Sequence, residues 1–281
     1  MKKLLVIGSI NMDIVIETNN FPEVGETLLG NNINFFCGGK GANQAIAAAR
    51  MGEDVHFMGC IGDDEFGIKL IHNFRDNHIN TKLIDTIKGA STGVAAITVS
   101  EGDNSIIVVS GANSCLDKEY IRSKESKIKS FDYVLIQNEI PLSGVEEIIN
   151  ICNENNIQVI YNPAPYDNKS KKLIEKVTFV TPNEIEQNCI GKYSDNMITT
   201  LGEKGVLYKD EIIKANKVKV VDTTGAGDTF NGVFTAFLMK DKSPKEAIEY
   251  AQRASALSIK KKGAQTGMPE LEDVLWKDEE Y

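Results

Sequence analysis

A short glycine-rich segment in the C-terminal part of the chain carries a carboxylate where a helix is expected to begin. Residues 222–232 read Asp-Thr-Thr-Gly-Ala-Gly-Asp-Thr-Phe-Asn-Gly. Small residues let the backbone approach a ligand closely, and the first N–H groups of a helix have no acceptor within it. These groups can form an anion hole for a phosphoryl group in transfer, and Asp228 can take the proton from an attacking hydroxyl. The residues of the predicted hole are Gly225, Ala226, Gly227 and Asp228.

This segment differs from two well-known phosphate-binding loops. No Gly-Lys-Ser or Gly-Lys-Thr follows it, so it is not a Walker A loop. It is not a dinucleotide-binding fingerprint either, because no βαβ unit follows it. On this segment alone, Asp228 could also be a residue that only caps a helix.

Two further segments carry groups suited to sugar hydroxyls. Residues 38–45 read Gly-Gly-Lys-Gly-Ala-Asn-Gln-Ala, in which Lys40 and Asn43 supply hydrogen-bond donors on one turn. The segment Gly-Ser-Ile-Asn-Met-Asp leaves the end of the first expected strand, where open α/β sheets bind ligands. Its Asn11 and Asp13 could hold neighbouring hydroxyls. A glycine turn before an Ala-rich helix and a turn-forming Asn are the alternative interpretations.

These segments need a scaffold, and short apolar runs followed by helical patterns supply one. The predicted strands are residues 4–7, 55–58, 133–136, 158–161, 179–180, 198–201 and 218–221. The predicted helices are residues 42–51, 66–77, 143–155 and 228–240, the third opening with a capping box of Ser143 and Glu146. Strands that alternate with helices indicate an α/β fold whose mainly parallel sheet is covered on both faces.

Two regions break this alternation, at about residues 12–37 and 91–110. The first reads as short strands with turns, and the second as strands at 93–99 and 105–109 around a Glu-Gly-Asp-Asn turn. Paired with each other, they would form a small sheet that projects from the main domain as a lid. Two separate hairpins without a role are the alternative. No repeat or linker divides the chain, so residues 1–281 are predicted to form one domain.

Composition narrows the class of protein. The chain has 281 residues and a net charge of −9, and it lacks the basic stripe of a nucleic-acid-binding protein. No apolar run is long enough to span a membrane. The five cysteines are widely spaced without a CxxC pair, which favours reduced core thiols. We therefore expect a cytoplasmic protein that acts on small molecules, with no nucleic-acid or membrane partner.

Six motifs in order make the sequence resemble the PfkB carbohydrate kinase family over nearly its whole length. They are the three segments above, Asn-Pro-Ala-Pro from Asn162, Thr-Pro-Asn-Glu-Ile-Glu from Thr181 and Lys-Gly-Ala-Gln from Lys262. Gly-Ala-Gly-Asp is specific to the family, and residues 38–45 and the last motif are typical of its members that phosphorylate ribose. The resemblance implies a three-layer α/β/α sandwich with a mainly parallel central sheet and a small β-sheet lid.

The resemblance also implies roles for individual residues, with ATP as phosphoryl donor and Asp228 as general base. The sugar would be bound by Asn11, Asp13, Gly39, Lys40, Asn43, Glu139 and Asp228. The nucleotide site would use Asn183, Thr200, Gly202, Glu203, Gly205, Gly227 and Gln252, with Glu186 acting on Mg²⁺ indirectly. A monovalent cation, usually K⁺, would be held by Asp222, Thr224, Ser258, Lys261, Gly263 and Gly267, several through backbone carbonyls.

Family members pair through the lid, so the resemblance also implies a homodimer. One feature departs from the family pattern, because the chain between Asn183 and Thr200 is short and offers a helix only at 184–190. A parallel crossover needs about a dozen residues, so this connection can still be made. Two other hypotheses remain open. One is a family kinase for deoxyribose, a ketose or a nucleoside; the other is a sugar-binding protein without catalysis.

Overall fold

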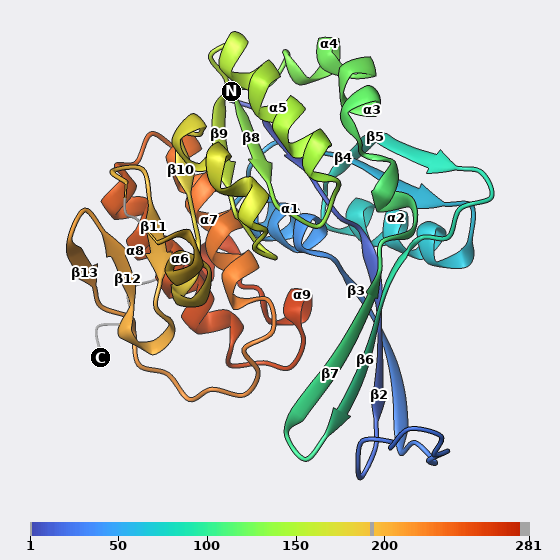
Figure 1. Cartoon of the computed structure of the whole chain (residues 1–281). Coiled ribbons are helices and arrows are strands. Elements are labelled where there is room, and N and C mark those ends of the chain that lie inside the picture. The colour runs from blue at the N-terminus through green and yellow to red at the C-terminus, as the bar shows by residue number, and fades with distance from the viewer. Residues whose placement is uncertain (1, 192–193, 276–281) are drawn as a thin grey trace.

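The computed structural model describes residues 2–191 and 194–275, and its centre is a six-stranded sheet in which every strand pair is parallel (Figure 1). The strand order is β10-β9-β8-β1-β4-β5. The strands are β1 (Leu4–Ile7), β4 (Val55–Gly62), β5 (Asn80–Ile87), β8 (Tyr133–Ile136), β9 (Gln158–Tyr161) and β10 (Phe179–Val180). Only β5 was not predicted, because it lies half-buried at the edge of the sheet and lacks a continuous apolar run.

Helices cover both faces of this sheet. Alternate residues of β1 face opposite ways: Leu4 and Val6 belong to one apolar cluster, whereas Leu5 and Ile7 belong to another. The first cluster includes α1 (Lys40–Arg50), α2 (Glu65–Asp76), α7 (Ala226–Met239) and α8 (Pro244–Ser258). The second includes α3 (Lys118–Ser123), α4 (Glu125–Ile128), α5 (Leu142–Glu154) and the 3₁₀ segment η2 (Asn168–Lys176). The predicted three-layer α/β/α sandwich is confirmed.

The two strand-only inserts form one four-stranded sheet, which projects from the three layers (Figure 1). Its strands are β2 (Asn11–Glu17), β3 (Asn32–Gly38), β6 (Gly93–Ser100) and β7 (Asp103–Val109), in the order β3-β2-β6-β7. The parallel pairing of β2 with β6 joins the inserts, from Asn11 opposite Gly93 to Glu17 opposite Val99. The small sheet expected beside the central one is therefore present, and its action as a lid stays a prediction.

The short crossover after β10 is made by a single helix, α6 (Glu184–Ile190). A capping box between Asn183 and Glu186 begins it, and Gly191 in the left-handed conformation ends it. The chain then forms the antiparallel sheet of β11 (Ile198–Thr200), β12 (Val206–Tyr208) and β13 (Glu211–Ile213). Parallel bridges from Val180 to Met197 and from Asn183 to Thr200 connect this sheet to β10. The remaining elements are η1 (Gly111–Cys115), η3 (Gly202–Lys204), α9 (Ala264–Gly267) and α10 (Leu271–Leu275).

Three local predictions were wrong. Residues 218–221 form no strand, although the segment is β-branched and leads into α7. The capping box of Ser143 and Glu146 does not form, because α5 begins one residue earlier at Leu142, directly after Pro141. Not every cysteine is a core thiol: Cys60 and Cys152 are buried, but Cys189 is exposed. Among the described residues, no helix has both the length and the apolar character to cross a lipid bilayer.

Helices α1 and α7 approach each other closely at Gly232. A Cβ atom on Gly232 would lie 2.4 Å from the Gln44 carbonyl oxygen and 2.6 Å from the Ala47 Cβ. Real Cβ atoms do not tolerate such contacts, so the absence of a side chain sets the distance between the two helices. This packing brings the N-terminal turn of α1 next to that of α7.

We predict that Gly232→Ala destabilises the protein by about 1–3 kcal/mol, because the helices must move apart. Urea unfolding measures the change. Gly227→Ala, in the same helix, is the control, since a Cβ there meets nothing within 4 Å. Equal free energies of unfolding for the two variants would contradict the assigned contact.

Candidate active site

The Asp228 carboxylate is buried where the N-terminal turns of α1 and α7 meet. Its side chain lies in the first turn of α7, and the whole residue is only 7% exposed. The Asp228 Oδ2 atom accepts a hydrogen bond of 2.9 Å from Asn43 Nδ2, and Oδ1 accepts one of 3.0 Å from Gln44 Nε2. The carboxylate is therefore held by two neighbouring amides of α1 and does not cap its own helix.

Burial is the main influence on the charge of Asp228, and it raises the pKa of the carboxyl. The positive charge of Lys40 and the amide donors of Asn43 and Gln44 oppose this and lower the pKa, whereas the negative charge of Glu139 raises it. A carboxylate whose pKa is raised is a stronger base than an exposed aspartate. The surroundings of Asp228 suit proton abstraction.

Lys40 is the cation around which the carboxylates of the site gather. Chiefly because of Asp228, the pKa of Lys40 is raised, and Glu139, Glu186 and Asp13 act in the same direction. The Glu139 Oε2 atom also accepts a hydrogen bond of 3.0 Å from the Lys40 backbone N–H. Carboxylates accept from hydroxyl groups and an ammonium donates to them, so this cluster can bind a molecule rich in hydroxyls.

Glycines allow β2, β3 and the start of α1 to meet at this cluster. Gly39 has a φ of 90°, and a Cβ there would lie 2.9 Å from the Asn11 backbone nitrogen. A Cβ on Gly38 would lie 2.2 Å from a carboxylate oxygen of Asp13. The structure thus brings the predicted sugar-binding residues of two segments, the one with Asn11 and Asp13 and the one at 38–45, together with Asp228.

Asn113, which the sequence did not single out, orients Asn11. Its Nδ2 atom donates to Asn11 Oδ1 at 2.8 Å, and its Oδ1 atom accepts from the Ile10 backbone N–H at 3.0 Å. This hydrogen bond fixes the orientation of the Asn11 amide. Its oxygen is occupied by Asn113, and its NH₂ group is left to donate to a ligand. Gln44, Gln137 and Gln265 also belong to the site and were missed as functional residues, although Gln44 and Gln265 lie within motifs that the sequence showed.

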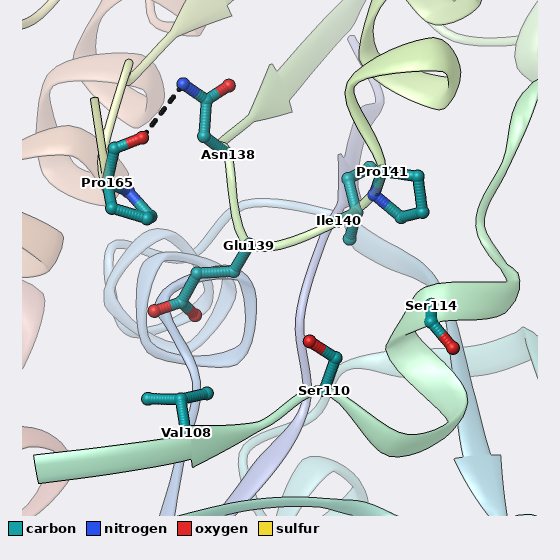
Figure 2. Close-up of a pocket in the computed structure, with 8 residues that line it drawn as sticks. All are labelled: Val108, Ser110, Ser114, Asn138, Glu139, Ile140, Pro141 and Pro165. Carbon is teal, nitrogen blue, oxygen red and sulfur yellow. Dashed lines mark hydrogen bonds between the residues drawn. The ribbon is translucent and has the colours of Figure 1, made fainter. Parts of the chain in front are cut away.

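A cavity of about 390 Å³ lies between the projecting sheet and the loop after β8. Figure 2 shows the eight residues around it, with the Glu139 side chain directed away from Pro141. The residues lining it are Val108, Ser110, Ser114, Asn138, Glu139, Ile140, Pro141 and Pro165. The cavity connects a strand of the predicted lid with one of the predicted sugar-binding residues.

The turn at the start of α7 is the predicted anion hole. Gly225 is the N-cap, with a φ of 78°, which is the left-handed region that glycine adopts without strain. A Cβ on Gly225 would lie 2.9 Å from the Ala264 Cα, so the turn rests against α9. The Ala226 N–H donates to the Thr223 carbonyl at 3.2 Å, so of the four predicted N–H groups of the hole this one already has an acceptor. The hole is thus held in place from outside the helix.

Most of the predicted nucleotide residues lie along the antiparallel sheet and α8, whereas Asn183 caps α6 and Gly227 lies in α7. Gly205 has a φ of 109°, and a Cβ there would lie 2.0 Å from the Ile213 carbonyl oxygen. The same oxygen accepts a hydrogen bond of 2.9 Å from Gln252 Nε2. Thr200 ends β11, and Gly202 and Glu203 follow in η3. Gly205 and Gln252 thus meet at the Ile213 carbonyl, and Thr200 pairs with Val206 beside them.

Asn183 and Glu186, predicted to organise Mg²⁺ and phosphate, bond to each other. Asn183 Oδ1 accepts from the Glu186 N–H, and Glu186 Oε2 accepts from the Asn183 N–H, both at 2.8 Å. Burial raises the pKa of the Glu186 carboxyl, while the Asn183 N–H and Lys40 oppose it. Carboxylate and amide oxygens are ligands that fit Mg²⁺.

The predicted monovalent-cation residues also come together. Asp222 Oδ2 accepts from the Gly263 N–H at 2.8 Å, and a Cβ on Gly267 would lie 2.3 Å from the Ser258 carbonyl oxygen. Burial alone would raise the pKa of Asp222, but its hydrogen bonds from Thr224 and Gly263 outweigh burial and lower it. An ionised carboxylate beside backbone carbonyls is an oxygen-rich set that fits a hard cation. Lys261 lies in the loop between α8, which ends at Ser258, and α9.

Comparisons with known proteins agree with this geometry. Residues 1–271 match the model of the pfkB family of carbohydrate kinases. The ribokinase of Lactococcus lactis is 43% identical over 98% of this chain and 96% of its own. The crystal structure of a ribokinase from Thermotoga maritima superposes with a TM-score of 0.88, at 36% identity and 98% coverage of both chains. An Arabidopsis thaliana ribokinase complexed with ribose and ATP has a TM-score of 0.87 at 29% identity, covering 98% of this chain and 97% of that one.

Asp13 makes the stability of the protein depend on pH. Burial first, and then Glu139 and Asp228, raise the pKa of Asp13 from 3.8 to about 7, against the influence of Lys40. Between these two values the folded state holds a proton that the unfolded chain has lost. The free energy of unfolding that Asp13 contributes therefore falls as pH rises from about 4 to about 7.

We predict that Asp13→Asn, which cannot ionise, gains stability relative to the unmodified protein over this interval. The gain should be on the order of a few kcal/mol. Urea unfolding at a series of pH values measures it, with the exposed Asp76→Asn as control. A difference between Asp13→Asn and the unmodified protein that stays constant from pH 4 to pH 7 would contradict the assigned shift.

Proposed function

Since the chain belongs to the pfkB family of carbohydrate kinases, we propose that it converts ATP and D-ribose to ADP and D-ribose 5-phosphate. The observation that carries the proposal is the buried carboxylate of Asp228 at the start of α7. Two amides of α1 donate to it, and the positive charge of Lys40 acts on it. The similarity to ribokinases over nearly the full length supports ribose as the sugar. A cytoplasmic location, where ATP is available, fits the five cysteines without disulfide partners.

In this reaction Asp228 takes the proton from the primary hydroxyl of the sugar. The freed oxygen forms a bond to the γ-phosphorus of ATP, while the bond from that phosphorus to the ADP oxygen breaks. Charge on the transferring group is stabilised by the N–H groups of Gly225, Gly227 and Asp228. Such transfer depends on positioning and charge stabilisation, which this site offers.

Recognition of the sugar divides between acceptors and donors. Asp13 and Glu139 accept hydrogen bonds from hydroxyl groups, whereas Lys40, Asn43 and the NH₂ group of Asn11 donate to hydroxyl oxygens. Each hydroxyl of a bound sugar can then both donate and accept. Closure of the projecting sheet over the cavity would exclude water, which competes as a phosphoryl acceptor.

Two cations complete the proposed site. Mg²⁺, associated with the nucleotide, would neutralise phosphate charge, with Asn183 and Glu186 organising it and Glu186 acting indirectly. A monovalent cation at Asp222 and the carbonyls near Gly263 would supply positive charge beside the anion hole. The groups of this chain perform the remaining work: Lys40 helps to hold the sugar, the start of α7 binds the phosphoryl group, and Asp228 moves the proton.

A coupled assay for ADP tests the reaction. The purified protein should release ADP when ribose, Mg²⁺ and K⁺ are present together with ATP. Turnover on deoxyribose, fructose or a nucleoside but not on ribose would overturn the substrate and keep the family. A binding protein without catalysis would be stabilised against heat by sugar and would ignore MgATP.

Asp228→Asn should fold and bind ribose but lose about 10²-fold or more in kcat, because an amide cannot accept the proton. Steady-state kinetics measures the loss, and ribose-induced thermal stabilisation confirms binding. Asp117→Asn is a matched control, since Asp117 caps α3 by accepting from the Tyr120 N–H and should leave kcat unchanged. Near-normal turnover by Asp228→Asn would remove Asp228 from the role of base.

We also propose that two copies of the chain pair through the projecting sheet. Its edge strand β7 is exposed along its whole length and carries four apolar residues in a row, Ile106, Ile107, Val108 and Val109. Such a patch on a strand edge favours association with a second copy.

Ile107→Glu should convert the dimer to a monomer of 30.9 kDa, because it places a charge in the apolar contact. Light scattering after size-exclusion chromatography measures the mass. Ile212→Glu is the control, since Ile212 is an exposed isoleucine on β13, outside the projecting sheet. A monomeric unmodified protein, or a dimeric Ile107→Glu variant, would contradict the pairing.

A further inference from the structure

Two buried glutamines support Asp228 although the proposed reaction assigns them no role. Gln44 donates directly to Asp228 Oδ1 at 3.0 Å. Gln265 does not touch Asp228; its Nε2 atom donates to Asn43 Oδ1 at 2.8 Å, and Asn43 Nδ2 donates to Asp228 Oδ2 at 2.9 Å. Gln44 is 0% exposed and Gln265 8%. Each carboxylate oxygen is therefore held by its own series of amides.

The direction of both series is fixed by the carboxylate of Asp228, which only accepts, and a further amide donates to each glutamine from behind. Gln44 Oε1 accepts from Gln137 Nε2 at 2.7 Å. Gln265 Oε1 accepts from Asn73 Nδ2 at 2.9 Å. If either glutamine amide turned over, its oxygen would face another oxygen and its NH₂ group would face another NH₂ group. Gln44 Nε2 also donates to Asn162 Oδ1 at 3.1 Å, and each series ends in an amide that donates to the carboxylate.

We propose that Gln44 and Gln265 are positioning residues for the catalytic base, Gln44 directly and Gln265 through Asn43. Together they fix both oxygens of Asp228, so that the carboxylate cannot rotate and its remaining lone pairs face the bound hydroxyl. The inference rests on the proposed function, because it assigns the proton transfer to Asp228.

Through Asn43 and Gln44, the two series also lower the pKa of Asp228, against the larger effect of burial, which raises it. The charged groups that act on Asp228 are Lys40 on α1, Glu139 after β8 and Asp13 on β2, of which only Lys40 is positive. Hydrogen bonds donated to a carboxylate favour its charged form, and amides in series polarise one another. The glutamines therefore act with Lys40 against burial and the two neighbouring carboxylates.

Gln265 connects the base to a distant part of the chain. It lies on α9, whose Ala264 also packs against Gly225 at the start of the anion hole. The same short helix thus supports the proton acceptor and the phosphoryl-binding turn. A displacement of α9 would disturb both at once.

Gln265→Met tests the proposal, because methionine has a similar length but donates no strong hydrogen bond. We expect kcat for ribose to fall about tenfold with KM changed less than about threefold. The acidic limb of the kcat–pH profile should move to higher pH by about half a unit to one unit, since loss of a donor raises the pKa of Asp228. Asn73→Ala, which removes the hydrogen bond donated to Gln265 Oε1, should give the same changes at smaller size.

Asn155→Ala is the control, because Asn155 donates to the Ile151 carbonyl in α5, outside the site. It should lower thermal stability without moving kcat or the pH profile. If Gln265→Met and Asn73→Ala behave like this control, Gln265 is only structural and the proposal is overturned. Because Asn73 is only half-buried, we expect Asn73→Ala to fold, and it provides the test if Gln265→Met does not fold.

A measurement without turnover separates this inference from the proposed function. The ¹³C carboxyl signal of Asp228, assigned by its absence in Asp228→Asn, can be titrated in each variant. A higher titration midpoint in Gln265→Met supports the positioning role even if the protein fails to phosphorylate ribose. An unchanged midpoint overturns the role even if ribose is the substrate.

Discussion

The structure depends on the groups that stabilise one buried carboxylate, that of Asp228. Burial raises the pKa of Asp228, and an ionised carboxylate without partners in a protein interior is costly. Lys40, Asn43 and Gln44 supply the compensation, and all three come from the first turn and a half of α1. A buried charge that is compensated in this way is both reactive and fixed in direction, as a general base has to be.

That compensation is possible only because the backbone permits unusually close contacts. Gly232 lets α7 approach α1, and Gly41 lets α1 approach the loop after β1, where a Cβ would lie 2.7 Å from the Ser9 nitrogen. The three-layer core keeps these helices on the sheet through apolar packing. Function in this fold therefore depends on glycines away from the chemistry as much as on the residues that perform it.

Much of this arrangement could be predicted from the sequence, because it follows from patterns among residues that are neighbours in the chain. Apolar runs marked most of the central strands, and each motif follows the strand or opens the helix that positions it. Contacts between residues far apart in the chain could not be predicted in this way. No pattern near Asn11 predicts its hydrogen bond with Asn113, and none near Asn43 predicts its hydrogen bond with Gln265. The strand expected at 218–221 fails for a related reason. Its β-branched residues satisfy local propensity, but the chain there leads into α7 without a strand partner.

The most direct test of the account is a crystal structure with ribose and a non-hydrolysable ATP analogue bound. The account predicts a carboxylate oxygen of Asp228 about 2.6–3.2 Å from the primary hydroxyl, with that hydroxyl in line with the terminal phosphate. An Asp228 side chain turned away from the sugar, or a primary hydroxyl that faces Glu139 or Asp13 instead, would contradict it.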